Sequence, residues 1–274
     1  MSDRERTHGF GRRASPDPRD AAHPMTPHLT ASALTHRTWS APGLPLDQGA
    51  TPMCVGYSCR GLLLAAPVIN KPEHPSAQEI YDGAQRNDEF PDTPPADGSS
   101  VRGGFKFLQK CGLIGEYVWA ANVDEVMRFV LTRGPVVLGI NWYDSMMEPD
   151  RHGWLHISKN AQIVGGHAIL AIGVNMATGA LRLMNSWGAE WGQRGRAWLR
   201  REDLARLLHE DGEAGAPTEI KPAPSPIPVP TPAAVVIHDA TVAVDVGRHD
   251  ANIHSSVPLN LEDGQYDVTF TLAQ

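Results

Sequence analysis

Cys54 lies in the stretch "LDQGATPMCVGY", at a position that suits covalent chemistry. The apolar residues that follow it predict a helix that begins near Cys54. A thiol at the start of a helix faces unpaired N–H groups and the positive end of the helix dipole, and both favour the nucleophilic thiolate. Gln48, six positions earlier, would bring an amide N–H to the negative oxygen that forms when a thiolate attacks an acyl carbon. The alternative interpretation is that Cys54 is a small buried core residue and that Gln48 is an ordinary turn residue, neither with a catalytic role.

His167 opens the apolar stretch "HAILAIGV", and Asn185 ends the alternating stretch "LRLMNSW". A polar side chain in such core-like sequence needs a hydrogen-bond partner. If the two stretches are neighbouring strands, the amide oxygen of Asn185 accepts a hydrogen bond from the imidazole and fixes its tautomer and orientation. Trp187 would then cover that bond and keep water away from it. The alternative is a polar strand end beside a core tryptophan.

Composition excludes several classes of protein. The net charge is −7 without a long basic run, which argues against nucleic acid or an anionic membrane as the main partner. Three cysteines make no disulfide framework, and the first thirty residues contain no apolar signal, so we expect a cytoplasmic or particle-associated protein. Cys59 and Cys111 fall inside predicted helices and are expected in the core. Walker, HExxH and CxxC motifs are absent, so no metal or other cofactor is expected.

The elements that would position these residues follow a simple order, with helices first and strands later. Helices are predicted from Cys54 to before Pro67, after a capping box of Ser76 and Glu79, over about 100–111, and over about 122–134. Strands are predicted over 136–142, 167–174, 181–187 and 195–200. Helices segregated from an antiparallel sheet indicate an α+β fold with two lobes.

Composition also divides the chain into segments. We expect an extended N-terminal arm, a globular domain, a Pro-rich linker and a small β-hairpin tail, over residues 1–40, 41–212, 213–232 and 233–274. Every second residue of 222–232 is proline, which is typical of a stiff polyproline II spacer. In the tail, Tyr266, Val268, Phe270 and Leu272 form one apolar face after the turn signal Asp263-Gly264.

Three stretches together resemble a known family. "DQGATPMCVGY", "GGHAILAIGV" and "LMNSWGAEWGQRGRAWLRR" resemble the Cys, His and Asn blocks of papain-like cysteine peptidases. The resemblance covers about 41–205. It implies a helical lobe that carries Cys54 and an antiparallel β lobe that carries His167 and Asn185, with Gln48 as the fourth catalytic residue.

Two further stretches extend the resemblance. "ADGSSVRGGFKFLQKCGL" is similar to the segment in which substrate backbone pairs with a glycine-containing edge, and the family pattern implies substrate-binding roles for Gly98, Ser99, Gly166 and Trp187. "HGFGRRASPDPRD", residues 8–20, resembles the short leader of bacterial relatives. We call residues 8–20 the leader. The chain departs from papain at Val55, where papain has tryptophan. The gap of 113 residues from Cys54 to His167 is shorter than is usual in the family, so loops are expected to be trimmed and subsite preference is not carried over. The long inhibitory prosegment of the zymogens is also expected to be missing.

The mechanism that the resemblance implies is acyl transfer through a thioester at Cys54. The expected activity is cleavage of peptide bonds in a peptide or protein substrate. An acyl transferase or isopeptidase would use the same acyl-enzyme, and a catalytically dormant structural or anchoring module is the alternative outside enzymes. Residues 233–274 are expected to attach the enzyme to a second copy of the chain or to a host assembly.

Overall fold

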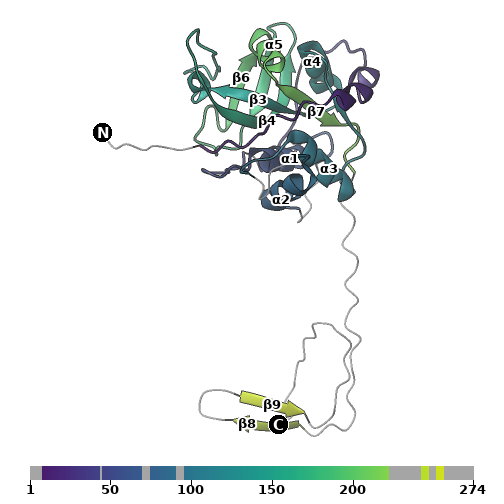
Figure 1. Ribbon diagram of the computed structural model, residues 1–274, viewed down its shortest axis with the longest axis vertical. Coiled ribbons are helices and arrows are strands. Elements are labelled where there is room, and N and C mark those ends of the chain that lie inside the picture. Colours follow the sequence, from purple (N-terminus) through teal and green to yellow (C-terminus); the bar gives the residue numbers. More distant parts are fainter. Residues whose placement is uncertain are drawn as a thin grey trace, which may run out of the picture. The chain divides into compact units, whose positions relative to one another are not determined.

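The structure is a computed structural model that describes residues 8–43, 45–69, 75–90, 96–221, 242–246 and 251–255. The chain separates into two compact units, Met1–Ala223 and Pro224–Gln274. We describe each unit by itself. Figure 1 labels their helices and strands.

Three helices form the helical lobe of the first unit: α1 (Cys54–Leu64), α2 (Ala77–Asn87) and α3 (Val101–Lys110). The predicted capping box begins α2, where the Ser76 hydroxyl accepts the Glu79 N–H and the Glu79 carboxylate accepts the Ser76 N–H. At α3 the Ser100 hydroxyl alone forms the cap, by accepting the Gly103 N–H at 2.9 Å. These caps confirm the predicted starts of both helices.

The second lobe consists of one sheet and the helices packed on it. The strand order in the sheet is β2-β7-β3-β4-β5-β6, and β1 pairs in addition with β4. The strands are β1 (His36–Thr38), β2 (Tyr117–Trp119), β3 (Val136–Tyr143), β4 (Ile163–Asn175), β5 (Ala180–Met184), β6 (Arg196–Arg200) and β7 (Glu213–Pro217). The helices are α4 (Val123–Thr132) and α5 (Arg201–His209), with short 3₁₀ turns at Pro18–Ala22, Thr26–His28 and Asp144–Met146. All of the strand pairings are antiparallel.

Strand β4 joins two hydrophobic cores. Successive side chains of a strand point to opposite faces. Ile169 and Ala171 therefore pack with α4 and α5 residues in one core, while Leu170 and Ile172 pack with residues of α1 and α3 in the other. This arrangement is the two-lobed α+β fold that the sequence predicts.

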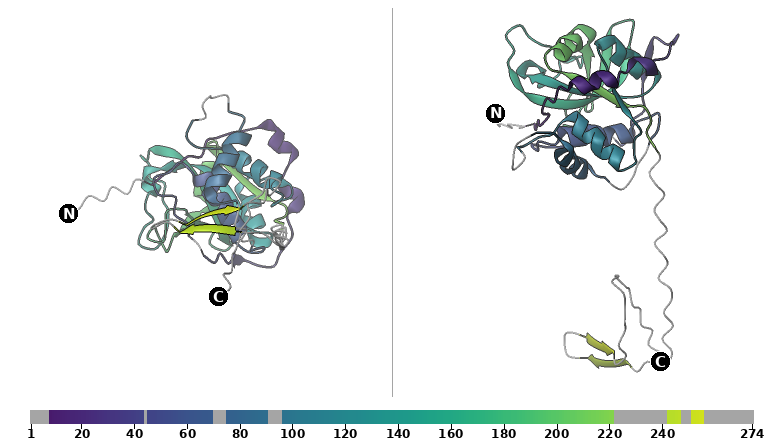
Figure 2. Two further views of the ribbon diagram at one scale, coloured as in Figure 1. Left: turned by 90° about the horizontal axis from the view of Figure 1, so that it is seen from below. Right: turned by 45° about the vertical axis from the view of Figure 1, so that its right-hand side comes forward.

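The N-terminal segment is part of the first unit rather than an extended arm. Strand β1 pairs with β4, and Met25 is fully buried in the core of the sheet lobe. Figure 2 shows the purple segment running along the junction of the two lobes. The expected arm over 1–40 is therefore wrong for its described part. Its Arg, Pro and His content resembles that of disordered chains, and its apolar contacts are too widely spaced to form a pattern.

The predicted linker also begins too early. Strand β7 lies inside the sheet, between β2 and β3, with Ala214 and Ala216 buried. Its sequence "EAGAP" has no β-branched or aromatic residue, so no strand signal marked it. Beyond it, the Lys221 N–H still bonds to the Leu113 carbonyl at 2.8 Å. The proline-alternating residues 222–232 lie outside the described part of the chain.

The second unit contains one described antiparallel pair, β8 (Val242–Val246) with β9 (Ala251–Ser255). The sequence predicted a hairpin around Asp263-Gly264, and those residues lie outside the described ranges. The pair that is described comes earlier in the tail than the predicted one.

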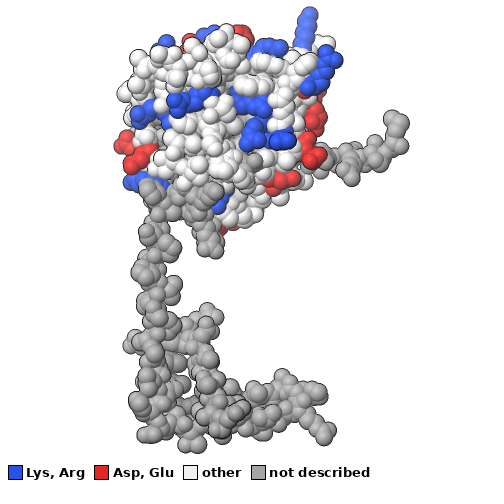
Figure 3. Space-filling model, turned by 180° about the vertical axis from the view of Figure 1, so that it is seen from behind, with Lys and Arg blue, Asp and Glu red and all other residues white. Residues whose placement is uncertain are grey.

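The surface of the first unit carries dispersed charge. On the face in Figure 3, Lys and Arg side chains are separated by uncharged surface and do not merge into one basic patch. Within the described residues, the helices are too short or too polar to cross a bilayer.

The position of β7 predicts a sharp boundary for truncation. A chain ending at Lys221 should keep a cooperative thermal transition near that of the full chain. A chain ending at Gly212 should lose that transition, because an interior strand paired on both edges is removed from a domain whose total stability is roughly 5–15 kcal/mol. Circular dichroism melts measure both. Equal melting temperatures for the two truncated chains would show that β7 is dispensable.

Candidate active site

Cys54 is the first residue of α1 and is completely buried. Its sulfur accepts a hydrogen bond from the backbone N–H of Ala168, 114 positions later, at 3.3 Å. Ala168 follows His167 in β4, so the packing of α1 on β4 brings the two predicted blocks together. The first turn of the helix thus delivers the thiol to the strand that carries the imidazole.

His167 and Asn185 form the predicted hydrogen bond. The distance from His167 Nε2 to Asn185 Oδ1 is 2.7 Å, and the same oxygen accepts the Ser186 N–H at 2.9 Å. An oxygen that accepts twice assigns the ring proton to Nε2. Nδ1 of the neutral ring is then a proton acceptor, and it is buried without a hydrogen-bond partner among the described residues. The predicted adjacency of the strands is also present, since Leu170 of β4 pairs with Met184 of β5.

Two tryptophans enclose the imidazole. The ring of Trp187 lies 4.7 Å from that of His167, and the ring of Trp142 lies edge-on at 4.9 Å, measured between centroids. Both indoles are almost completely buried. Trp187 therefore covers the imidazole as the sequence predicted. Trp142 covers it as well, which the sequence reasoning missed.

Gln48 is held with its amide N–H groups facing the cleft. Its Oε1 accepts the Ser186 hydroxyl at 2.6 Å, which fixes the orientation of the amide. Its Nε2 donates to the carbonyl oxygens of Thr51 at 2.7 Å and Gly9 at 3.1 Å. Gly9 belongs to the leader, so this amide already binds a peptide carbonyl that comes from outside the catalytic lobes.

The leader backbone occupies the groove between the lobes. The Ser99 N–H donates to the Gly11 carbonyl at 2.8 Å, and the Arg13 N–H donates to the Ser99 carbonyl at 2.9 Å. Across the groove, the Gly166 carbonyl accepts the N–H groups of Gly11 and Arg12 at 3.1 and 3.0 Å. The leader is therefore hydrogen-bonded to both lobes at once.

All four residues predicted to bind substrate contact the leader. Ser99 and Gly166 supply the backbone bonds, and the Trp187 indole N–H donates to the Gly9 carbonyl at 3.1 Å. At Gly98, a Cβ would lie only 2.3 Å from the Gly11 carbonyl oxygen, so only glycine permits this approach. The structure brings the four together, and their roles toward a substrate stay predictions.

Burial sets the protonation of the covered site. Burial raises the pKa of the Cys54 thiol to about 12, while backbone N–H groups oppose the rise. Burial lowers the pKa of His167 to about 4. Both groups are therefore neutral near pH 7. The sequence predicted a thiolate favoured by the helix start, whereas burial of the sulfur raises its pKa more than the backbone N–H groups lower it.

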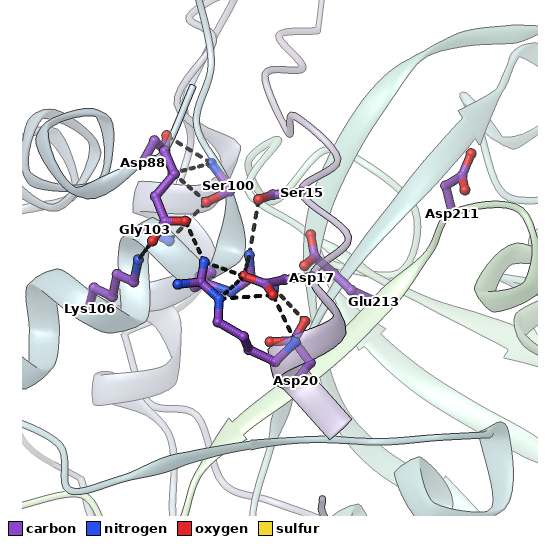
Figure 4. Close-up of polar contacts among 12 residues, drawn as sticks. Ser15, Asp17, Asp20, Asp88, Ser100, Gly103, Lys106, Asp211 and Glu213 are labelled. Atoms are coloured by element: carbon purple, nitrogen blue, oxygen red, sulfur yellow. Dashed lines mark hydrogen bonds and ion pairs between the residues drawn. The ribbon is translucent and has the colours of Figure 1, made fainter. Parts of the chain in front are cut away.

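Ion pairs fasten the leader outside the groove. Arg102 of α3 pairs with Asp17 at 3.5 Å, with Asp20, and with the Ser15 hydroxyl at 3.0 Å. Glu89 bridges Arg19 of the leader and Lys106 of α3. Figure 4 shows Ser15, Asp17 and Asp20 of the leader beside this helix. Sequence reasoning missed this cluster because its charges lie about 80 positions apart.

The remaining cysteines differ from each other. Cys59 is buried in the core as predicted, whereas Cys111 is exposed. The helix α3 ends at Lys110, so Cys111 leaves the periodic face that pointed to the core. Within the described residues, no group of His, Cys, Asp and Glu side chains is arranged to hold a metal ion.

Sequence comparisons find one family across this region. The family model described as "Papain family cysteine protease" matches residues 105–211. An uncharacterized peptidase C1-like protein of Acanthamoeba polyphaga mimivirus is 33% identical over 77 residues, 27% of this chain and 25% of that protein. Cathepsin B-like cysteine proteinase 3 of Ostertagia ostertagi is 28% identical over 127 residues, 45% of this chain and 68% of that protein. The chain thus spans about a quarter of the mimivirus relative and two thirds of the nematode one.

Structural comparisons extend the likeness of fold to the helical lobe. Xylellain, a cysteine protease from Xylella fastidiosa, matches 79% of this chain and 97% of its own with a TM-score of 0.55 at 19% identity. ProCathepsin B from Trypanosoma congolense matches 79% and 87% with a TM-score of 0.56 at 13% identity. The described fold is thus that of papain-like cysteine proteases, and residues 105–211, which include His167 and Asn185, match the papain family model.

Proposed function

We propose that this chain is a cysteine peptidase whose leader keeps it latent by occupying the substrate groove. One observation carries the proposal: Nδ1 of His167 is a buried acceptor without a partner among the described residues, in a strand that touches the Cys54 sulfur. An unpaired buried acceptor costs stability and does nothing for the fold. Such an atom is needed by an enzyme that must accept the thiol proton, and it argues against a dormant scaffold.

The proposed reaction begins when the leader has left the groove. The Cys54 proton passes to His167 Nδ1, and the thiolate attacks the carbonyl carbon of a peptide bond. Gln48 Nε2 and the backbone N–H of Cys54 hold the negative oxygen. The C–N bond breaks as His167 returns the proton to the leaving amine. Water, deprotonated by His167, then hydrolyses the thioester and restores the thiol.

Asn185 acts on the orientation of His167 in this scheme. Its oxygen binds Nε2–H and leaves Nδ1 to face the thiol, while Trp187 and Trp142 keep competing water away. Because the amide of Asn185 does not titrate, only the thiol and the imidazole should shape the pH dependence of the rate.

The direction of the leader explains how it resists cleavage. Arg12 pairs with Ser99 in parallel, and its backbone N–H donates to the Gly166 carbonyl at 3.0 Å. Attack requires a peptide carbonyl carbon held against the Cys54 sulfur. The leader fills the groove in this parallel course without offering such a carbonyl to the thiol.

Two finer points of the function remain proposals. The acyl-enzyme could pass its acyl group to an amine instead of water, and adding a peptide amine to the assay and analysing products by mass spectrometry separates transfer from hydrolysis. We also propose that residues 233–274 are an attachment element. The spacing of prolines in 222–232 supports this role, as does the division of the chain into two units at residue 224.

Unseating the leader should expose the nucleophile. Gly11 has a φ of +120°, and a Cβ there would lie 2.0 Å from the Pro52 carbonyl oxygen. A Cβ at Gly9 would lie 2.0 Å from the Thr51 carbonyl oxygen. The Gly9→Ala/Gly11→Ala chain, which we call the leader variant, should alkylate at Cys54 at least tenfold faster with iodoacetamide at pH 7.5. The reason is that a thiol pKa of about 12 in place of about 9 leaves roughly a thousandfold less thiolate.

The alkylation rate at each cysteine is measured by peptide mass spectrometry. Exposed Cys111 is the internal reference, and its rate should not change. Gly43→Ala is the matched control, because Gly43 has a φ of +77° but, among the described residues, no atom lies within 4 Å of a Cβ built there. Unchanged Cys54 labelling in the leader variant would remove the leader from the explanation of the buried thiol.

Catalytic roles can be separated in the leader variant. Cys54→Ala should abolish cleavage of a casein substrate, whereas Cys111→Ala should keep it. Gln48→Ala should lower the acylation rate constant by about 10²–10³, the usual loss for one oxyanion donor. The measurement is the release of fluorescent peptide under single-turnover conditions. A change under about threefold for Gln48→Ala would take this residue out of the mechanism.

Removal of residues 222–274 tests the attachment element. In the leader variant, the chain ending at Lys221 should cleave peptides at a rate within about twofold of the longer chain, because the truncation stays outside the sheet. Its size by light scattering should be smaller if the tail joins copies of the chain. If the size is the same and retention by the host assembly is also unaffected, the tail has another role.

A further inference from the structure

Strands β5 and β6 lie at one end of the sheet, and one side of this pair is rich in arginine. Arg182 of β5 pairs with Trp198 of β6 in the register, and Arg196 and Arg200 lie two positions to either side of Trp198. Alternate side chains of a strand share a face, so these four lie on the same side. Arg200 is exposed and the other three are half-buried. We call these four residues the arginine face.

Neutral acceptors hold the guanidinium groups of Arg182 and Arg196 in place. Arg182 Nη1 donates to Gln193 Oε1 at 2.8 Å, and Arg196 Nη1 donates to the Arg194 carbonyl at 3.0 Å. The Gln193 amide is itself fixed, because its Nε2 donates to the His152 carbonyl at 2.9 Å. A guanidinium carries five N–H donors, so both side chains are oriented and still have donors for a ligand.

Tryptophan rings support two of the arginines. The guanidinium carbon of Arg182 lies 4.8 Å from the centroid of the Trp198 ring, and that of Arg200 lies 5.1 Å from the centroid of the Trp154 ring. The two ring centroids are 6.1 Å apart. These cation–π contacts restrain long side chains before any ligand is present. Less conformational entropy is then lost when a ligand binds to them.

The positive charge of Arg182 and Arg196 is not balanced by a neighbouring carboxylate. Among the described residues, Arg200 pairs with Asp203 at 4.0 Å, whereas neither Arg182 nor Arg196 has an ion-pair partner. Burial lowers the pKa of Arg182, and the nearby charge of Arg196 lowers it further. Like charges that face each other on a sheet are unfavourable. An anion that lies against both arginines would relieve this repulsion.

The arginine face adjoins the candidate active site. Strand β5 ends at Met184, the residue before Asn185, and Met184 pairs with Arg196 in the register. The Asn185 N–H donates to the Gly195 carbonyl at 2.9 Å, one residue before Arg196. Arg182 precedes Asn185 by three residues, which is roughly 10 Å along a strand. A few residues of extended chain therefore span the distance from the site to this face.

The surroundings favour a short acidic peptide over a nucleic acid strand. Guanidinium groups bind carboxylates and phosphates equally well in geometry, so the guanidinium groups do not decide between them. The Trp154 and Trp198 rings already carry guanidinium groups, which makes them poor platforms for stacked bases. Asp203 limits the positive surface at Arg200, and the net charge of −7 opposes a long polyanion.

We propose that the arginine face docks an acidic segment of a protein substrate outside the groove, through carboxylates that bind Arg182 and Arg196. This inference rests on the proposed function. The docked segment is far from the bond that breaks and contacts the enzyme equally before and during the reaction. Docking should therefore lower KM and leave kcat unchanged.

A binding measurement in the full-length chain tests the face without any need for catalysis. A rhodamine-labelled peptide of glutamates is followed by fluorescence anisotropy at low salt, where surface charges are least screened. Arg182→Gln/Arg196→Gln should weaken binding at least tenfold. The matched control is Arg201→Gln/Arg206→Gln, which removes the same charge from arginines already paired with carboxylates. The control should bind within about twofold of the unchanged chain.

A single substitution guards against a folding defect in the double variant. Arg196→Gln leaves both tryptophan contacts in place, because these involve Arg182 and Arg200. It should weaken binding at least threefold with an unchanged thermal transition. Equal weakening in the matched control would overturn the proposal. So would equal affinity for a glutamine peptide, or tighter binding of an oligothymidylate of the same length.

A kinetic measurement separates failure of this inference from failure of the proposed function. In the full-length leader variant, a fluorogenic peptide extended with glutamates at one of its two ends should have a KM at least fivefold lower than its glutamine counterpart. Arg182→Gln/Arg196→Gln should remove that difference. Glutamate-specific binding without any cleavage would reject the peptidase and keep the face as a peptide-binding surface. Cleavage with equal KM for glutamate and glutamine extensions at both ends would keep the peptidase and reject the face.

Discussion

The contact between the first turn of α1 and strand β4 is the constraint on which the site depends. It places the Cys54 sulfur on the N–H of Ala168, the residue that follows His167, and it joins the two cores. Because β4 contributes alternate side chains to each core, a slip of one residue would move His167 to the opposite face. Burial on both faces of β4 therefore fixes the register that the chemistry requires.

A second contact links Gln48, the proposed oxyanion donor, to the residue that orients the imidazole. Ser186 donates its hydroxyl to Gln48 and its backbone N–H to Asn185. One residue thereby orients both amides. The Gln48 N–H groups are directed at peptide carbonyls, and the Asn185 oxygen is directed at the imidazole ring. Such preorganisation is what electrostatic catalysis requires, since dipoles already in place need no reorganisation during the reaction.

The leader bonds, from within the same chain, to the groups that we predict to bind substrate. Its backbone pairs with Ser99 and Gly166, and its rings lie on Trp187, where His8 stacks at a centroid distance of 4.4 Å. A tethered segment competes at a high effective concentration, so modest contacts are sufficient to hold it. In the proposed latent state the leader also helps to bury the thiol and the imidazole, and burial favours the neutral form of both groups.

The sequence alone determined the four catalytic candidates, the predicted helix and strand types and the two-lobed α+β class, because these rest on local signals: caps, periodicity and the blocks around Cys54, His167 and Asn185. It did not determine the path of residues 8–40 or strand β7, whose small or polar residues become ordered only through pairing with distant strands. The protonation of the site and the pairing of Arg12 with Glu213 were likewise decided by tertiary structure. Burial and charge contact join residues about 200 positions apart, and no local pattern records such a separation.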